Sequence, residues 1–157
     1  MTDEMISALA RKGGVIQINF GCEFLSQDSA NTSTWTNSAL KRNLEAVAAR
    51  EARTPAQRKQ SSSQLTAKAN EQMVRATLAD VVAHIGRVVE IAGIGAVGIG
   101  SDFDGVGCVP KGLDDVSKFP ALTRALLEKG YTAEQIRKIY GENVLRVMRA
   151  VEARRIP

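Results

Sequence analysis

Residues 96–105 read Ala-Val-Gly-Ile-Gly-Ser-Asp-Phe-Asp-Gly, and this stretch decides the fold. Its first five residues are apolar or glycine, follow a glycine turn at 93–95, and predict a short buried strand. Two carboxylates, Asp102 and Asp104, come directly after that strand. In folds with parallel strands, ligands bind at the carboxyl ends of the strands. The junction is therefore the predicted chemical centre of the chain.

The segments on both sides of this strand alternate between helix and strand. Apolar residues at three- and four-residue spacing predict a helix over about 71–92, and the β-branched run at 15–20 predicts an earlier strand. Further helices are predicted over 2–11, over about 119–129 and from Thr132 onward; the first and last of these begin with a threonine that can cap them. This order predicts an α/β fold whose strands are parallel and joined by helical crossovers. Two strands cannot close a barrel by themselves.

A polar and basic segment at about 31–70 interrupts the alternation. Residues 38–68 are compatible with helix, but Pro55 and the serine run at 61–63 are expected to break it. We expect a helical and loop excursion on the surface of a single domain that spans 1–157.

The overall charge does not point to a particular partner. The chain carries 21 Lys and Arg against 17 Asp and Glu, a net charge of +4, and its pI is about 9.3. No nucleic-acid-binding motif accompanies this charge, so we expect no nucleic-acid partner. No run approaches the roughly 20 apolar residues of a membrane span, so no membrane segment is expected in this chain. Nothing in the sequence predicts a localisation.

The two aspartates after the strand have two interpretations. Glycines at 98, 100 and 105 remove side chains around them, which would let a substrate approach the backbone closely. Asp also caps turns for purely structural reasons. The pattern alone leaves both interpretations open.

Two other reactive side chains are expected to be structural. His84 lies beside the apolar face of a predicted helix and has no second His to form a metal site with it. Cys22 follows the first predicted strand, but no His is placed to activate it, so we expect a small buried thiol rather than a nucleophile.

Three segments, in this order and spacing, resemble the membrane (renal) dipeptidase family of zinc peptidases. They are Gly-Ile-Gly-Ser-Asp-Phe-Asp-Gly at 98–105, Gly-Leu-Asp-Asp-Val-Ser-Lys-Phe-Pro at 112–120 and Glu-Asn-Val-Leu-Arg-Val-Met at 142–148. The strand at 13–20 and the segment 83–93 fit the same family. The resemblance implies an amidohydrolase-like (β/α)8 TIM-type barrel, of which this chain would be the C-terminal part, about strands 7 and 8 with flanking helices.

The resemblance also implies a chemistry and roles for three residues. The family hydrolyses dipeptides with two zinc ions and a bridging hydroxide. Asp102 matches its aspartate after strand eight, which contacts the substrate and shuttles the proton, and Asp104 matches a second aspartate with a supporting role. Phe24 stands where some relatives have a Tyr near the substrate. Arg87 replaces a His that is common in relatives, and the excursion is longer than expected of a mammalian relative.

The family's metal ligands all lie upstream of the segment that this chain matches. We therefore expect residues 1–157 to be a partial metallo-dipeptidase barrel domain, the C-terminal part of the enzyme, with no metal ligand of its own. We expect this fragment alone to bind no zinc and to have no activity. The expected partners are a dipeptide substrate in the complete enzyme and, as a further option, a second copy in a homodimer. The alternative is a degenerate, non-catalytic interaction module that pairs through its open strand edges. The sequence does not decide the preferred dipeptide or the acceptance of D-residues or β-lactams.

Overall fold

The computed structural model describes residues 1–154 and divides into two compact units. The first, here called the sheet unit, contains residues 1–21 and the residues from Thr77 onward. The second, here called the hairpin unit, contains Cys22–Ala76. The described residues include no helix that is both long and apolar enough to cross a membrane.

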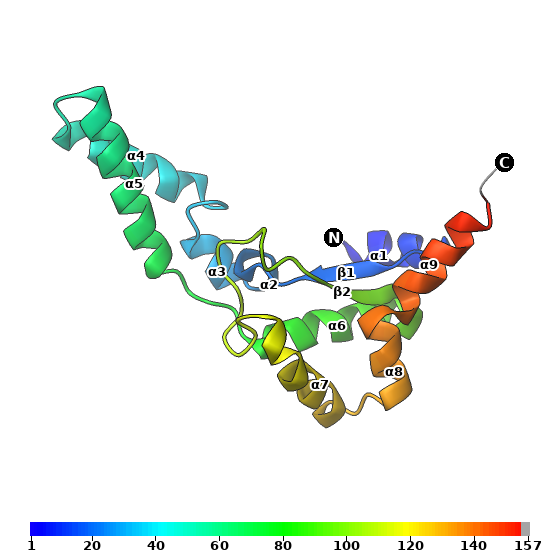
Figure 1. Ribbon diagram of the computed structural model, residues 1–157. Helices are drawn as coiled ribbons and strands as arrows, with labels where there is room; N and C mark the ends of the chain where they lie inside the picture. The colour runs from blue at the N-terminus through cyan, green and yellow to red at the C-terminus, as the bar shows by residue number, and fades with distance from the viewer. Residues whose placement is uncertain (155–157) are drawn as a thin grey trace. The chain divides into compact units, whose positions relative to one another are not determined.

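The sheet unit is built around two parallel strands, β1 (Ile16–Asn19) and β2 (Val97–Ser101), which lie side by side in Figure 1. Helix α6 (Leu78–Ala92) is the last helix in the connection between them, and it packs against both strands, as expected of a crossover between parallel strands. The prediction of two parallel strands with a helical crossover is therefore confirmed. The helices of this unit are α1 (Asp3–Arg11), α6 (Leu78–Ala92), α7 (Phe119–Glu128), α8 (Ala133–Arg137) and α9 (Asn143–Glu152), with a π-helical turn at Lys138–Glu142 and 3-10 turns at Ile94–Ala96 and Val116–Lys118.

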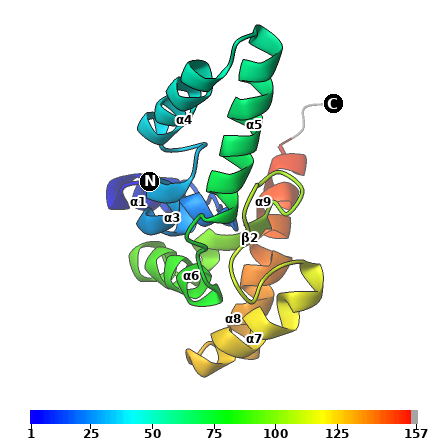
Figure 2. The same ribbon diagram turned by 90° about the vertical axis from the view of Figure 1, so that its left-hand side faces the viewer.

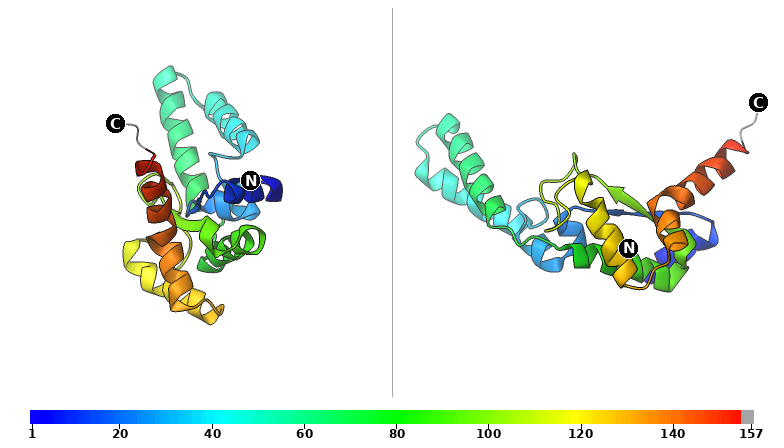
Figure 3. Two further views of the ribbon diagram at one scale, coloured as in Figure 1. Left: turned by 90° about the vertical axis from the view of Figure 1, so that its right-hand side faces the viewer. Right: turned by 60° about the horizontal axis from the view of Figure 1, so that its bottom comes forward.

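The core of the sheet unit lies between the strands and the helices around them. Helix α6 contacts α1 and α7, and α7 leads into α8 (Figure 3). The face of α6 that packs inward contributes four of its apolar side chains to the core, as its three- and four-residue spacing predicts. The fully buried side chains include Phe20, Val81, Ile85, Val97, Leu113, Leu122, Leu126 and Ile139.

Helix α6 begins later than its apolar pattern predicts. The sequence predicted a start near Glu71, but Glu71 is the last residue of the preceding helix, and α6 begins at Leu78. The Asp80 carboxylate accepts hydrogen bonds from the backbone N and the Oγ1 of Thr77, at 2.7 and 2.8 Å. This cap fixes the start of the helix. The Leu78 N–H donates to the Lys111 carbonyl, at 3.1 Å, rather than to a carbonyl of a preceding helical turn, so the helix does not extend before Leu78.

The hairpin unit is helical. It contains the short helices α2 (Cys22–Leu25) and α3 (Gln27–Thr32), followed by α4 (Ser38–Glu51) and α5 (Pro55–Glu71), which lie side by side in Figure 2. The predicted break at Pro55 is confirmed, since this residue opens α5 behind the cap residue Thr54. The predicted break at the serine run is wrong, because residues 61–63 lie inside α5.

Candidate functional site

Asp102 lies immediately beyond the carboxyl end of β2, where the strand pattern predicted it. Asp102 and the preceding Ser101 both have positive φ angles, +68° and +48°. Residues other than glycine adopt this left-handed conformation at a cost of roughly 1–2 kcal/mol each. Strained backbone of this kind gathers at functional sites, so the junction is the first place in the chain to look for one.

A β-bulge brings the end of β1 next to this junction. Ile18 pairs with Ile99, but the next residue, Asn19, pairs with Ser101, so Gly100 is an extra residue in β2. A Cβ atom at Gly100 would lie only 3.2 Å from the Ile18 carbonyl oxygen, which is tighter than ordinary van der Waals contact. The absence of a side chain at position 100 therefore permits the bulge and the close approach of the two strands.

Asn19 and Asp102 form a hydrogen-bonded pair at the carboxyl ends of the two strands. The Asn19 Nδ2 donates to the Asp102 Oδ2 at 2.9 Å. The backbone N–H of Gly21 donates to the Asn19 Oδ1 at 2.7 Å. Since a backbone N–H can only donate, the Asn19 oxygen must face Gly21 and its NH2 group must face Asp102. The orientation of the amide is thus set by its two partners.

The other side of the Asp102 carboxylate rests on a glycine. The Gly105 N–H donates to the Asp102 carbonyl oxygen at 3.1 Å and closes a tight turn. A Cβ atom at Gly105 would lie 2.3 Å from the Asp102 Oδ1 and 2.9 Å from its Cγ. Only glycine fits at position 105 while the carboxylate keeps its present place.

Phe103 anchors the loop that carries the two aspartates. Its ring packs edge-on against the fully buried Phe20, with ring centroids 5.5 Å apart, and against Phe119 at 6.2 Å. Phe119 in turn contacts Tyr140 at 5.9 Å. Aromatic pairs of this geometry contribute roughly 0.5–1.5 kcal/mol beyond their buried area. Asp102 and Asp104, on either side of Phe103, are both exposed.

Phe24, the third candidate site residue, belongs to the hairpin unit. Phe24 is 46% exposed, and its ring packs edge-on against that of Trp35, which is 68% exposed, with ring centroids 5.4 Å apart. Two large exposed rings in contact are uncommon on a protein surface, where apolar groups are usually scattered.

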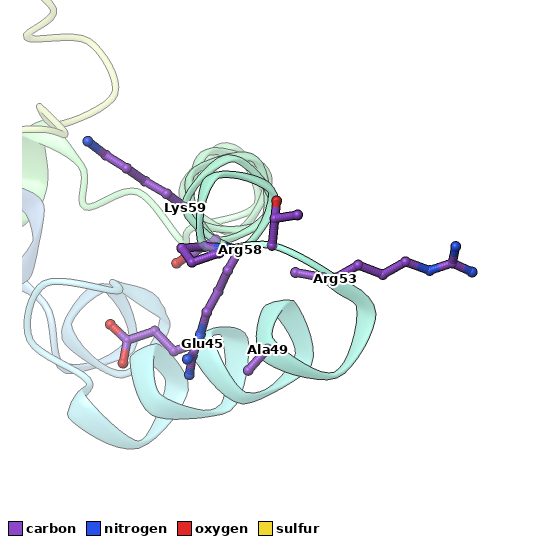
Figure 4. Close-up of a pocket in the computed structure, with 9 residues that line it drawn as sticks. Glu45, Ala49, Arg53, Arg58 and Lys59 are labelled. Atoms are coloured by element: carbon purple, nitrogen blue, oxygen red, sulfur yellow. The ribbon is translucent and has the colours of Figure 1, made fainter.

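Two hollows in the described residues lie elsewhere. One, of about 540 Å³, is lined in the hairpin unit by Glu45, Arg53, Arg58 and Lys59 among others. Figure 4 shows Arg53, Arg58 and Lys59 pointing in three different directions, so their charges do not converge on one ligand position. The other, of about 530 Å³, lies in the sheet unit along α6 beside Lys129–Tyr131. Neither hollow is lined by Asn19 or Asp102.

The cysteines differ from the sequence prediction. Cys22 is fully buried, as predicted. However, neither Cys22 nor Cys108 is a free thiol in the described part of the chain, since both sulfurs are disulfide-bonded. The prediction of a buried thiol is therefore wrong, because its sulfur is oxidised rather than protonated.

A model of the membrane dipeptidase family, peptidase family M19, matches residues 1–156. This match covers nearly the whole sequence and decides the family. The chain belongs to the membrane dipeptidase family. The resemblance predicted from residues 98–105, 112–120 and 142–148 is confirmed.

Solved structures of dipeptidases and metallopeptidases resemble the chain. The probable dipeptidase PvdM from Pseudomonas aeruginosa matches with a TM-score of 0.69 and 27% identity, over 93% of this chain and 39% of that chain. A metallopeptidase from Rhodobacter sphaeroides, liganded with a phosphinate mimic of the dipeptide L-Ala-D-Ala, matches with a TM-score of 0.59 and 22% identity, over 91% and 29%. Dipeptidase AC, a metallopeptidase of family M19, matches with a TM-score of 0.58 and 23% identity, over 91% and 29%. The last two matches show the fold alone.

The chain spans well under half of the length of each of these three proteins. Its mixed helix and strand arrangement is the one that these larger structures contain over the matched region. Two of the three are metallopeptidases by description. Within residues 1–154 no three His, Cys, Asp or Glu side chains gather in a group that could hold a metal ion. The described residues therefore do not by themselves fit a metal, and Asp102 is instead paired with an amide.

Proposed function

We propose that this chain is the part of a zinc-dependent dipeptidase that carries the proton-transferring carboxylate, Asp102. One observation carries the proposal: in a chain of the membrane dipeptidase family, an exposed and hydrogen-bonded aspartate stands at the carboxyl end of a parallel strand. That end of the strands is where α/β barrels carry out chemistry. The 27% identity to a probable dipeptidase supports the same reaction class.

The proposed fold of the complete enzyme is a (β/α)8 barrel in which β1 and β2 are strands seven and eight. Two features of the sheet unit support this assignment. The strands are parallel and joined through α6, as adjacent strands of such a barrel are. Within residues 1–154 the outer edges of β1 and β2 have no strand partner, which leaves room for further strands on both sides.

The reaction we propose for Asp102 is proton transfer during hydrolysis of a dipeptide. The carboxylate accepts a proton from the attacking water as its oxygen bonds to the peptide carbonyl carbon. It then donates that proton to the departing nitrogen as the C–N bond breaks, and the carboxylate is regenerated. Asp104 and Phe24 are proposed to contact the substrate in supporting roles. Zinc, two ions in the complete enzyme, is assigned to ligands other than the residues described here.

The test compares the full-length gene product that contains residues 1–157 with its Asp102→Asn variant. We expect dipeptide hydrolysis in the presence of zinc, and a fall in kcat of roughly 10²- to 10⁴-fold in the variant, the usual contribution of a general acid or base. Asp104→Asn is the matched control, with a smaller loss that is expected mainly in KM. A variant as fast as the wild type would show that Asp102 does not shuttle the proton.

A second measurement concerns the 157-residue chain alone. Equilibrium dialysis against zinc should find no pair of tight sites, because the described carboxylates and His84 do not gather in one place. Two tight zinc sites on this chain would contradict the proposal.

The competing function is a non-catalytic interaction module. Among the described residues no strand pairs with the outer edges of β1 and β2, and this favours the interaction module, since an open edge is a template for pairing with another chain. A full-length product that binds zinc but hydrolyses no dipeptide would support this alternative, and co-purification of a partner that protects the strand amides from hydrogen exchange would identify it.

A further inference from the structure

We propose that Asn19 is a positioning residue for Asp102, holding the carboxylate in the one orientation from which it can exchange a proton with both water and the leaving nitrogen. The inference rests on the proposed function of Asp102 and assigns a role to a residue in the other strand. Asn19 lies 83 positions earlier in the chain, at the end of β1.

The hydrogen bonds around Asn19 form a chain with a fixed direction. The Gly21 N–H holds the Asn19 oxygen at 2.7 Å, which leaves only the NH2 group to face the Asp102 Oδ2 at 2.9 Å. A donor aimed at one carboxylate oxygen fixes the rotation of the whole group. The amide itself is held by the main chain, so it cannot turn its oxygen toward Asp102 without losing the Gly21 contact.

The backbone on both sides supports the same arrangement. The bulge at Gly100 sets Asn19 opposite Ser101 rather than opposite Gly100, and the positive φ angles of Ser101 and Asp102 turn the chain at that point. On the far side of the carboxylate, Gly105 leaves room for Oδ1, where a Cβ atom would lie 2.3 Å away. One oxygen is thus held by a donor and the other lies against a glycine.

Asparagine is well suited to this position because it offers an acceptor and a donor on a short side chain. Aspartate would still accept from Gly21, but it would set a second negative charge against Asp102. Leucine has nearly the same shape and can neither accept nor donate. These two substitutions therefore remove the donor in different ways while filling similar space.

The experiment is a double-mutant cycle in the full-length gene product. Asn19→Leu should lower kcat by about 10- to 100-fold with little change in KM, the size of effect expected when a catalytic group is displaced by about 1 Å. The same substitution made in the Asp102→Asn variant should cause no further loss, because Asn19 acts only through Asp102. A merely structural role would lower activity by the same factor in both backgrounds.

Two further variants keep the test decisive. Asn19→Asp preserves the acceptor for Gly21 and should be at least as slow as Asn19→Leu, so it serves if the leucine variant does not fold. Asn43→Leu, at an exposed asparagine of α4, is the matched control and should keep wild-type activity.

The outcomes separate this inference from the function on which it rests. If Asp102→Asn is slow and both Asn19 variants are as fast as the wild type, or if the losses multiply, the positioning role is overturned while the dipeptidase assignment stands. If Asp102→Asn is itself fully active, the assignment of the proton shuttle fails and the role of Asn19 fails with it.

Discussion

Replacing Asn143 by alanine should destabilise the sheet unit by about 2–4 kcal/mol. Asn143 is 4% exposed at the start of α9. Its Nδ2 donates to the carbonyl oxygens of Ile94, at 2.7 Å, and of Val97, at 2.9 Å. Each bond contributes about 1 kcal/mol net, and a buried acceptor left without its donor costs about 1–3 kcal/mol. The alanine variant loses both donors at once, which gives the stated range.

The assay is equilibrium unfolding in urea followed by far-UV circular dichroism. Fluorescence is less suitable, because the single tryptophan, Trp35, belongs to the hairpin unit and is already 68% exposed. Asn143→Asp should be at least as destabilising as Asn143→Ala, since a carboxylate cannot donate to a carbonyl. Arg149→Ala, at an exposed site of the same helix, should change stability by less than about 0.5 kcal/mol. An unchanged m value with Asn143→Ala within 0.5 kcal/mol of wild type would refute the reasoning.

Two further predictions concern the site loop and the aromatic cluster. Gly105→Ala should lower kcat at least about 10-fold in a dipeptidase assay, with little loss of helix content, because its Cβ would displace the Asp102 carboxylate. Gly107→Ala is the control and should be neutral in the same assay, because no atom lies within 4 Å of its added Cβ. Burial raises the pKa of the Tyr140 phenol above its ordinary value of 10.0, outweighing the hydrogen bond with Thr123 that lowers it. As the pH rises, the unfolded chain therefore loses the Tyr140 proton before the folded chain does. The contribution of Tyr140 to the free energy of unfolding is complete below pH 10 and is lost as the pH rises through the raised pKa of the folded state. The urea midpoint should fall less between pH 8 and pH 11 in Tyr140→Phe than in the wild type. An equal fall in the two proteins would contradict the raised pKa of Tyr140.

Local signals in the sequence predicted the helix boundaries that depend on neighbouring residues. Thr2 caps α1 by accepting from the Met5 N–H at 3.4 Å, and Thr132 caps α8 in a capping box with Gln135. These caps join residues three positions apart, so the sequence alone contains both partners.

The start of α6 at Leu78 was not predicted, although one of its two causes is local. Thr77 and Asp80, three positions apart, form the cap of this helix and could have been recognised in the sequence. The main-chain hydrogen bond from Leu78 to Lys111, 33 positions later, is the part that no local pattern reveals. The serine run at 61–63 was misjudged for a different reason. Each serine costs only about 0.5 kcal/mol in a helix interior, and α5 has a proline start, a capping box and good helix formers on either side of the run. A modest local preference was outweighed by the rest of the helix.

The same distinction applies to the candidate site. The position of Asp102 could be predicted because it depends only on where a buried strand ends. The role of Asn19 could not, because its partner is set by the bulge at Gly100, and a strand pair without that extra residue would place Asn19 opposite position 100. A glycine inside a predicted strand is the one signal that could have suggested a bulge.

Two of the three motifs that carry the family resemblance lie at opposite ends of the same strands, and this explains what each does. In the segment 142–148, Asn143 binds the carbonyls on either side of the turn before β2, and Arg146 donates to the carbonyls of Gly13, at 2.8 Å, and Gly95, at 2.9 Å. These contacts hold the amino ends of both strands. The segment 98–105 forms their carboxyl ends, where Asp102 is exposed.

Variants of the two motifs should therefore separate stability from catalysis. Loss of the donors at Asn143 or Arg146 loosens the turns from which the strands begin, while the hydrogen bond from Asn19 to Asp102 at the far end depends only on the strands remaining paired. Substitutions at 143 and 146 should lower the urea midpoint and leave kcat nearly unchanged while the protein is folded. Substitutions at 19 and 105 should do the reverse. A variant at 146 that lowers kcat at a temperature where it is fully folded would show that strain at the amino ends reaches the carboxyl ends, and that the strands do not isolate the site from the turns.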